Sequence, residues 1–172
     1  LVGLLDRPTE GRVLLAGQDV SDLPDHARSV LRRDLIGFVF QSYYLLPELN
    51  VLDNALLPLR LKGPVRSEEL QRVTGLLERV GLLPYVRAFP HQLSGGQQQR
   101  VAVIRALAND PVLVLADEPT GNLDSASGRA VFELMRELNR SLKKTFVMVT
   151  HDERFAAEAD RVVRIQDGRV VP

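Results

Sequence analysis

The first forty residues show short apolar runs that are separated by turn residues. Such runs predict a short strand at 12–16 and a second strand at 35–40. Between them, the sequence DLPDHARSVLRRD predicts a helix from about Pro24 to Arg33. We therefore expect this part of the chain to form small strands around one helix.

From residue 42 to about residue 93 the pattern changes to helical segments that are interrupted by proline and glycine. Apolar side chains from Leu70 to Val80 recur at helical spacing, with Ser67 as the expected N-cap and Gly81 as the expected end of the helix. We interpret this segment as a helical lobe inserted between the sheet-forming parts of the chain.

Beyond the lobe, unalternating apolar runs predict two buried strands, at 112–116 and 145–150. An amphipathic helix is predicted at 127–142, a further strand at 161–165 and a hairpin turn at 167–168. Because strands and helices alternate, the predicted fold class is α/β, with a parallel sheet and crossover helices. The length of 172 residues suits a single domain.

The composition narrows the class of protein. Apolar residues make up 45% of the chain and charged residues 26%, which is the ordinary mix of a globular domain. Lys and Arg together number 22, as do Asp and Glu, so the charge balance argues against a sequence-independent nucleic-acid binder. The absence of cysteine excludes thiolate metal sites, and the apolar runs are too short to cross a bilayer. We expect a soluble, cytoplasmic protein.

Two adjacent carboxylates, Asp117 and Glu118, end the apolar run VLVLADEP. Open α/β sheets bind ligands at this edge, and neighbouring strand residues point to opposite faces, so each carboxylate can have its own task. Asp117 would face the Mg²⁺ shell of a nucleotide, and Glu118 would orient or deprotonate an attacking water. The alternative is a pair that caps the turn started by Pro119.

His151 and Gln41 follow two other predicted strands. The imidazole of His151 could contact a terminal phosphate, and the amide of Gln41 could coordinate a metal or hold a water. Both positions also suit ordinary polar residues at strand ends. Tyr43 and Tyr44 suit packing of the lobe or contact with a partner better than stacking on a nucleobase.

The sequence LSGGQQQRVAVIRAL begins a helix in a way that favours an anion. Ser94 is a natural N-cap, and Gly95 and Gly96 let the backbone approach an anion closely. The free amides and the positive end of the helix would stabilise phosphate. A plain cap on a core helix would not need both glycines, each of which costs up to about 1 kcal/mol in a helix interior. We therefore favour phosphate binding.

Together, these motifs resemble the ATP-binding subunits of ABC transporters. LSGGQQQRVA at 93–102 matches their signature motif, and LADEPTGNLD at 115–124 matches the Walker B strand and the D-loop. THD at 150–152 fits the switch histidine, and FVFQ at 38–41 fits the Q-loop. The wording is most similar to the subgroup that serves lipoprotein release and macrolide or peptide export. The resemblance implies a P-loop NTPase-type parallel core sheet with an inserted helical lobe.

The resemblance also implies roles for the residues at the strand ends. Asp117 and Gln41 would join the Mg²⁺ site. Glu118 would be the catalytic base, and His151 would touch the γ-phosphate of ATP.

A second group of residues would act across a dimer. The residues that would contact the ATP held by another subunit are Ser94, Gly95, Gly96 and Gln97. Asp124 would order the dimer seam. The implied activity is ATP hydrolysis by a homodimer or heterodimer of ATPase subunits, which powers transmembrane permease subunits and involves no nucleic acid. Through the permease, the dimer would sit on the inner face of the cell membrane.

One motif of the family does not occur in these 172 residues, the phosphate-binding P-loop GxxxxGK followed by Ser or Thr (Walker A). We interpret the chain as an N-terminally truncated cassette, with N-terminal strands and the Q-loop strand at 1–41, the lobe at 42–93 and the remaining motifs at 94–172. The alternative is a non-hydrolysing relative that acts as an interaction module. In either case we expect these residues alone to bind ATP poorly. By the resemblance, a missing strand would leave a gap in the sheet between 145–150 and 161–165.

Overall fold

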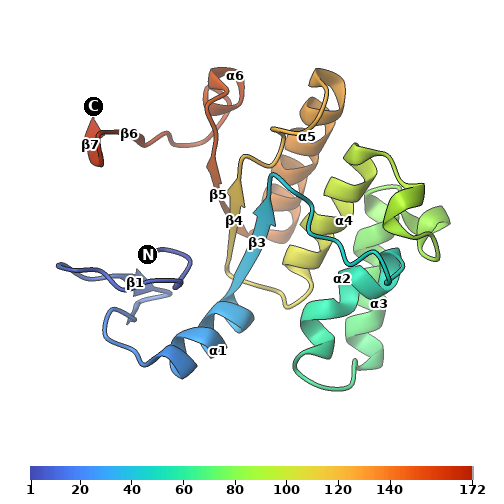
Figure 1. The fold of residues 1–172 in the computed structure, drawn as a ribbon, viewed down its shortest axis with the longest axis horizontal. Helices are drawn as coiled ribbons and strands as arrows, with labels where there is room; N and C mark the ends of the chain where they lie inside the picture. The colour runs from blue at the N-terminus through green and yellow to red at the C-terminus, as the bar shows by residue number, and fades with distance from the viewer. Residues whose placement is uncertain (172) are drawn as a thin grey trace.

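The computed structural model describes residues 1–171 and places a small parallel sheet at its centre. The helices at 51–60, 67–79, 95–107 and 125–142 lie on one side of this sheet, and the helix at 25–35 and two small hairpins lie on the other (Figure 1). The strands are β1 (Leu14–Leu15), β2 (Gln18–Asp19), β3 (Ile36–Phe40), β4 (Leu113–Asp117), β5 (Thr145–Val149), β6 (Arg164–Gln166) and β7 (Arg169–Val171). The helices are α1 (Asp25–Leu35), α2 (Val51–Arg60), α3 (Ser67–Arg79), α4 (Gly95–Leu107), α5 (Ser125–Leu142) and α6 (Glu153–Ala156), with the short 3-10 helices η1 (Leu83–Tyr85) and η2 (Pro90–Gln92).

The central sheet consists of β3, β4 and β5, in that order and all parallel. Phe40 of β3 pairs with Asp117 of β4, which in turn pairs with Val149 of β5. The three strands therefore end level with one another, and the segments that follow them leave the sheet at one edge. The α/β fold predicted from the sequence is confirmed.

Helix α4 lies between this sheet and the lobe formed by α2 and α3 (Figure 1). Its apolar side chains Val101, Ile104 and Leu107 are buried in the main hydrophobic core. Helix α5 adds Val131 and Leu138 to the same core, on the face that its spacing predicted. This burial stabilises the packing of the helices against the sheet, because each Å² of apolar surface removed from water contributes about 25 cal/mol to the free energy of folding. The packing holds the strand ends in place.

The lobe is helical as predicted, but α3 and its N-cap lie one residue earlier than expected. Arg66, not Ser67, occupies the N-cap position, because the Glu69 carboxylate accepts hydrogen bonds from both the Arg66 backbone and the Arg66 guanidinium. This pairing lowers the pKa of Glu69 to about 2. Gly81 ends the helix as predicted, with φ at 72°.

The strand predicted at 12–16 is wrong in its length. Only Leu14 and Leu15 pair, because the chain turns back at Ala16 and Gly17, which both have positive φ, and returns as β2. The hairpin and α1 cover a second, smaller core that includes Leu4 and Ile36.

The C-terminal prediction is right about the turn and wrong about the strand. Asp167 and Gly168 have φ of 50° and 74°, which suits a two-residue hairpin turn. The predicted strand at 161–165 contributes only its last two residues to β6, and β6 pairs with β7 rather than with the central sheet.

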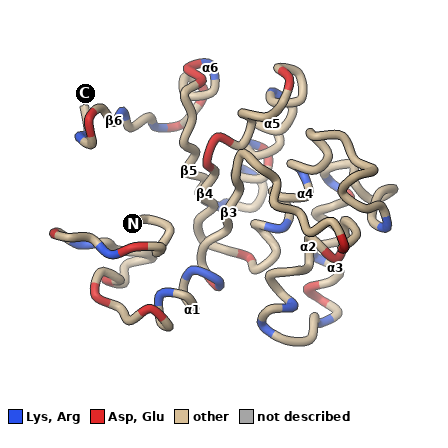
Figure 2. The backbone as a smooth tube through the Cα atoms, in the orientation of Figure 1, with Lys and Arg blue, Asp and Glu red and all other residues tan. Residues whose placement is uncertain are grey.

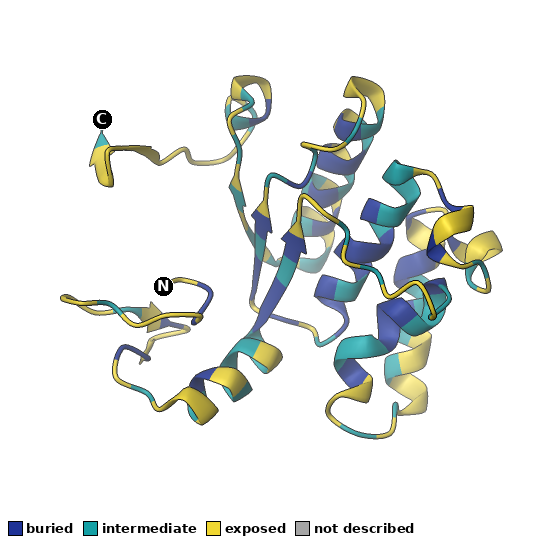
Figure 3. Cartoon of the chain, viewed as in Figure 1, coloured by how far each residue is buried: buried dark blue, intermediate teal, exposed yellow. Residues whose placement is uncertain are grey.

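Strand β5 is not the fully buried strand that its sequence predicted. Phe146 and Met148 pack against the main core, but Val147 and Val149 are 45% and 59% exposed. Figure 3 shows the contrast with the buried strands β3 and β4. Within residues 1–171, β5 pairs with β4 alone, so its other edge carries the gap that the resemblance led us to expect. None of the helices in this range combines the length and the apolarity needed to cross a membrane.

Candidate functional site

The level ends of the three parallel strands bring the predicted catalytic residues to one edge of the sheet. Gln41 follows β3, Glu118 follows β4, and His151 follows β5 after one intervening residue. Asp117 is the last residue of β4. Figure 2 shows the acidic stretch at this end of β4. We call these four residues, Gln41, Asp117, Glu118 and His151, the strand-end cluster.

Within the cluster, Glu118 and His151 are in direct contact. Oε1 of Glu118 accepts a hydrogen bond from the His151 backbone N–H at 3.1 Å and lies 2.7 Å from Nδ1 of the imidazole. Glu118 also donates its own backbone N–H to the Val149 carbonyl at 3.0 Å, which continues the parallel pairing one residue beyond the end of β4. A carboxylate in this position can accept a proton and hold the imidazole in one orientation.

Glu118 adopts an unusual backbone conformation, with φ at 43°. Such a conformation costs a residue that is not glycine about 1 kcal/mol or more and persists only where its surroundings enforce it. Here the hydrogen bonds to Val149 and His151 enforce it. The side chain of Glu118 is 22% exposed and that of His151 is 84% exposed, so both can be reached from solution.

Gln41 is held by an amide pair with Asn122. The Gln41 side chain donates to Oδ1 of Asn122 at 3.0 Å, and the Asn122 side chain donates to the Gln41 backbone carbonyl at 3.1 Å. A Cβ placed on Gly121 would lie 2.7 Å from Nε2 of Gln41, so any larger residue there would displace the Gln41 side chain. Sequence reasoning missed Asn122 as a partner of Gln41, although it lies within the motif LADEPTGNLD.

Asp117 is exposed at the end of β4. Within residues 1–171, no three acidic or histidine side chains gather into a ready metal site. The oxygen donors on neighbouring strand ends are the Asp117 carboxylate and the Gln41 amide, and hard oxygen donors of this kind suit Mg²⁺ when phosphate and water complete the shell.

The start of α4 is capped as the sequence predicted. Ser94 accepts from the Gln97 backbone N–H at 3.3 Å, and the Gln97 side chain accepts from the Ser94 backbone N–H at 2.9 Å. A Cβ on Gly95 would lie 2.7 Å from the Tyr43 hydroxyl, whereas a Cβ on Gly96 would make only an ordinary contact with Ser127 at 3.4 Å. We call Ser94, Gly95 and Gly96 the signature helix start.

These contacts separate the two glycines. A methyl group on Gly95 would displace the Tyr43 hydroxyl, whereas within residues 1–171 no steric contact requires Gly96. A capped core helix therefore accounts for one glycine and leaves the other to be explained by a ligand. The Tyr43 contact was not foreseen in detail, since the sequence indicated only packing of the lobe or contact with a partner.

Asp124 caps the next helix. Its Oδ1 accepts from the backbone N–H groups of Ala126 and Ser127 at 3.0 and 2.9 Å, at the start of α5. The hydrogen bonds from Ser127 and Ala126 hold the pKa of Asp124 below its usual value. The residue thus has a structural task within its own chain, whatever it does at a dimer seam.

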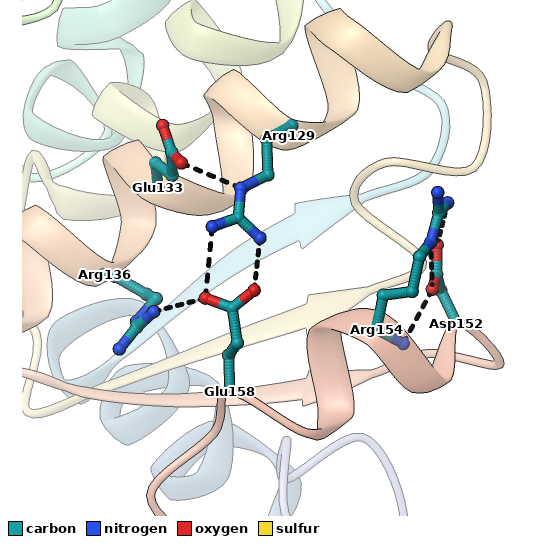
Figure 4. A network of polar contacts seen from close by, with 6 residues as sticks. All are labelled: Arg129, Glu133, Arg136, Asp152, Arg154 and Glu158. Atoms are coloured by element: carbon teal, nitrogen blue, oxygen red, sulfur yellow. Dashed lines mark hydrogen bonds and ion pairs between the residues drawn. The ribbon is translucent and has the colours of Figure 1, made fainter.

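An ionic network fixes the segment that follows His151 (Figure 4). The Glu158 carboxylate binds Arg129 and, at 2.6 Å, Arg136, both on α5. The Asp152 carboxylate caps α6 and binds Arg154 at 2.7 Å, which lowers the pKa of Asp152 to about 2. The Glu158 contacts tie the segment just after α6 to α5, and the Asp152 pair holds the start of α6.

Comparison with known proteins gives the family. The family described as "ABC transporter" matches residues 1–121. An uncharacterised ABC transporter ATP-binding protein of Thermotoga maritima is 51% identical over 99% of this chain and 72% of its own length. The lipoprotein-releasing system ATP-binding protein LolD 1 of Rhodopseudomonas palustris is 49% identical over 99% of this chain and 76% of its own length. The macrolide export ATP-binding/permease protein MacB of Rhodospirillum rubrum is 50% identical, with 26% of its length covered.

Solved structures agree with the fold. A dimeric ABC transporter cassette superposes with a TM-score of 0.83 at 45% identity, and covers 98% of this chain and 74% of its own length. A dimeric post-hydrolysis state of an ATP-binding cassette, bound to ADP and Pi, superposes with a TM-score of 0.82 at 44% identity, with the same coverage. The family match, the identity to relatives and the sheet with its strand-end residues agree, and the chain belongs to the ABC transporter family as an ATP-binding cassette.

Proposed function

We propose that this cassette hydrolyses ATP through the strand-end cluster and that two copies, each closing on the nucleotide of the other, drive a permease. The observation that carries the proposal is the contact of 2.7 Å between Glu118 and His151 at the level ends of β4 and β5. The motifs on both sides of a composite site are present on this one chain, at the strand ends and at the signature helix start.

In the reaction that we propose, a water oxygen bonds to the γ-phosphorus while the bond from that phosphorus to the bridging oxygen breaks. ADP leaves, and the proton of the water passes to the Glu118 carboxylate. Because Nδ1 of His151 is engaged by Glu118, we assign Nε2 to the γ-phosphate. Asp117 and Gln41 would hold Mg²⁺, which neutralises phosphate charge when it is bound.

The signature helix start would serve the ATP bound by the partner. Ser94, Gly95 and Gly96 supply backbone amides at the positive end of a helix of 13 residues, and Gln97 closes the cap that holds them. Asp124 at the start of α5 would order the seam between the two copies. A two-fold dimer then has two composite sites, and a single chain has none that is complete.

The names of two relatives support a proposal about the class of the transported substrate. They are named for lipoprotein release and for macrolide export. We propose that the permease partner handles an amphiphilic or peptide-like substrate of this kind, and that the cassette works at the membrane through that permease.

The test uses a complete cassette, meaning this chain joined to a phosphate-binding loop from its own gene or from the N-terminal segment of a relative. Glu118→Gln should lower turnover by at least about a thousandfold, because the general base is lost, and should leave an ATP-bound dimer that elutes early in size-exclusion chromatography. Glu153→Gln on α6 is the matched control, since Glu153 is exposed and outside the cluster. Unchanged turnover in Glu118→Gln would remove the assignment of the base.

A second measurement addresses the alternative that the chain is a non-hydrolysing interaction module. We expect isothermal titration of the 172-residue chain to show weak ATP binding. Stoichiometric, tight binding by this chain would contradict that expectation.

A further inference from the structure

Gln99, in the second turn of α4, is a buried polar side chain for which neither the cap nor the strand-end cluster accounts. It has no exposed surface, and its Nε2 donates to the Phe40 carbonyl at 3.1 Å and to the Pro119 carbonyl at 2.5 Å. Within the described part of the chain, its Oε1 has no hydrogen-bond partner. Burying an amide costs free energy unless the amide is hydrogen-bonded. The bonds to the two carbonyls are therefore what stabilises Gln99 in this position.

Asn54, the other polar side chain with no exposed surface within residues 1–171, has a purely local role. Its amide bonds to Leu46, Leu49 and Asn50, all within eight residues of it, and it closes the loop before α2. Gln99 instead joins two segments that lie 59 and 20 residues away along the chain. Its bonds connect elements and do not shape a local turn.

The two carbonyls belong to the immediate neighbours of the site residues. Phe40 precedes Gln41, and Pro119 follows Glu118. Gln99 therefore fixes the separation between the backbone that carries the metal-site amide and the backbone that carries the general base. It does so beside Glu118, whose φ of 43° has to be enforced by its surroundings.

Helix α4 makes a second contact with the segment that follows β3, a little under two turns further along the helix. Arg105 donates to the carbonyls of Tyr43 and Tyr44 at 2.7 and 2.5 Å. The helix between these contacts is buried on most of its surface, so it can move only as a unit. Gln99 lies about 6 Å along the helix axis from Gly95, at a rise of 1.5 Å per residue.

We propose that Gln99 is a positioning residue that couples the signature helix start to the Gln41 and Glu118 of its own chain. The inference rests on the proposed function, in which the helix start serves the nucleotide of the partner while Gln41 and Glu118 serve the nucleotide of their own chain. When phosphate engages the helix start, α4 shifts, and Gln99 transmits the shift to the Phe40 and Pro119 carbonyls. The occupation of one site thereby sets the geometry of the other.

The test is a mixed dimer of complete cassettes in which one copy carries Glu118→Gln, so that one general base remains. Gln99→Met, which keeps the volume and removes the donor, is placed either in the chain that keeps Glu118 or in the chain that carries Glu118→Gln. In the first arrangement we expect kcat to fall at least about tenfold, as is typical when a group that orients a catalytic residue is lost. KM for ATP should stay within about twofold.

In the second arrangement we expect kcat to be unchanged. Gln98→Met is the matched control, because the Gln98 side chain is half-buried on the same helix and, among the described residues, bonds only to the Leu93 carbonyl. An equal loss of kcat in both arrangements would mean that Gln99 merely supports the helix start. No loss in either arrangement would also overturn the inference.

The mixed dimer that keeps Gln99 in both copies separates this inference from the proposed function. If that dimer binds ATP but does not hydrolyse it, the proposed function fails, whatever Gln99 does. If it hydrolyses ATP and the Gln99→Met arrangements behave alike, only the coupling fails. Should Gln99→Met not fold, as judged by circular dichroism, Gln99→Asn replaces it. This variant keeps the amide one methylene shorter, and the same difference between the two arrangements is expected.

Discussion

The strand-end cluster and the signature helix start differ in how they are held, although both are built to meet phosphate. In the cluster, Glu118 keeps a costly backbone conformation and His151 is 84% exposed. At the helix start, Ser94 and Gln97 satisfy each other's backbone groups, and the helix behind them is buried. The cluster should therefore tolerate substitution without loss of folding, whereas loss of the Ser94 cap should affect folding and activity together.

The largest effect that sharpens this comparison is expected at His151. In a complete cassette, His151→Ala should lower turnover by about a hundredfold or more, because a group that contacts the γ-phosphate is removed. Its free energy of unfolding should be unchanged, because the side chain is mostly exposed. Phosphate release and urea denaturation measure the two quantities, and His26→Ala, exposed on α1, is the control. A clear loss of stability would show that the cluster is structural.

The next effect separates a phosphate site from a plain cap. Gly96→Ala should lower turnover at least about tenfold, because a methyl group blocks the approach of phosphate to the amides. It should leave the free energy of unfolding equal or slightly higher, since a Cβ there makes only an ordinary contact and alanine favours helix. Gly75→Ala on α3 is the matched control, a helical glycine with open space around it. Equal turnover in both variants would show that the helix start is a plain cap and not a phosphate site.

A smaller effect is expected at Ser94. Ser94→Ala should lower the free energy of unfolding of the 172-residue chain by about 1 kcal/mol, because the N-cap is lost. Ser67→Ala should cost much less, because Ser67 is the first residue of α3 and not its cap. Urea titration of the two variants measures the difference, and equal costs would contradict the assignment of the caps.

The smallest effect concerns acid. The pKa of Asp152 is lowered to about 2 by Arg154, so its pairing contributes stability above the usual pKa near 3.8 and loses it as the pH falls towards 2. Asp152→Asn should therefore be less stable than the parent chain at pH 6 and equally stable near pH 2. Thermal unfolding at both pH values tests this, and a difference that persists in acid would rule it out.

The sequence predicted those parts of the site that lie within a single motif. The apolar run before Asp117 fixes β4, and Ser94 with two glycines fixes the start of α4, because both signals are local. The amide pair of Gln41 and Asn122 joins residues 81 apart, and no periodicity reveals such a contact. The same limit hid the bonds of Gln99.

Errors in the fold have similar causes. The apolar run at 145–150 indicated a strand buried on both faces, but burial depends on what covers a strand, and Val147 and Val149 stay exposed. The run at 161–165 was predicted as a strand of five residues, whereas only its last two residues join β6, which pairs with β7 across the turn at 167–168. A strongly apolar run predicts a strand, but it does not predict which other strand it pairs with.

The level pairing of Phe40, Asp117 and Val149 has a consequence for how such a chain can change length. One added residue within 113–117 would turn every later side chain of that strand to the opposite face of the sheet. The carboxylates of Asp117 and Glu118 would then exchange the faces to which they point. One added residue in the largely exposed loop at 61–66 would alter no such alternation. Insertions inherited through evolution should therefore collect in that loop and be purged from the strand, even at positions where no side chain takes part in chemistry.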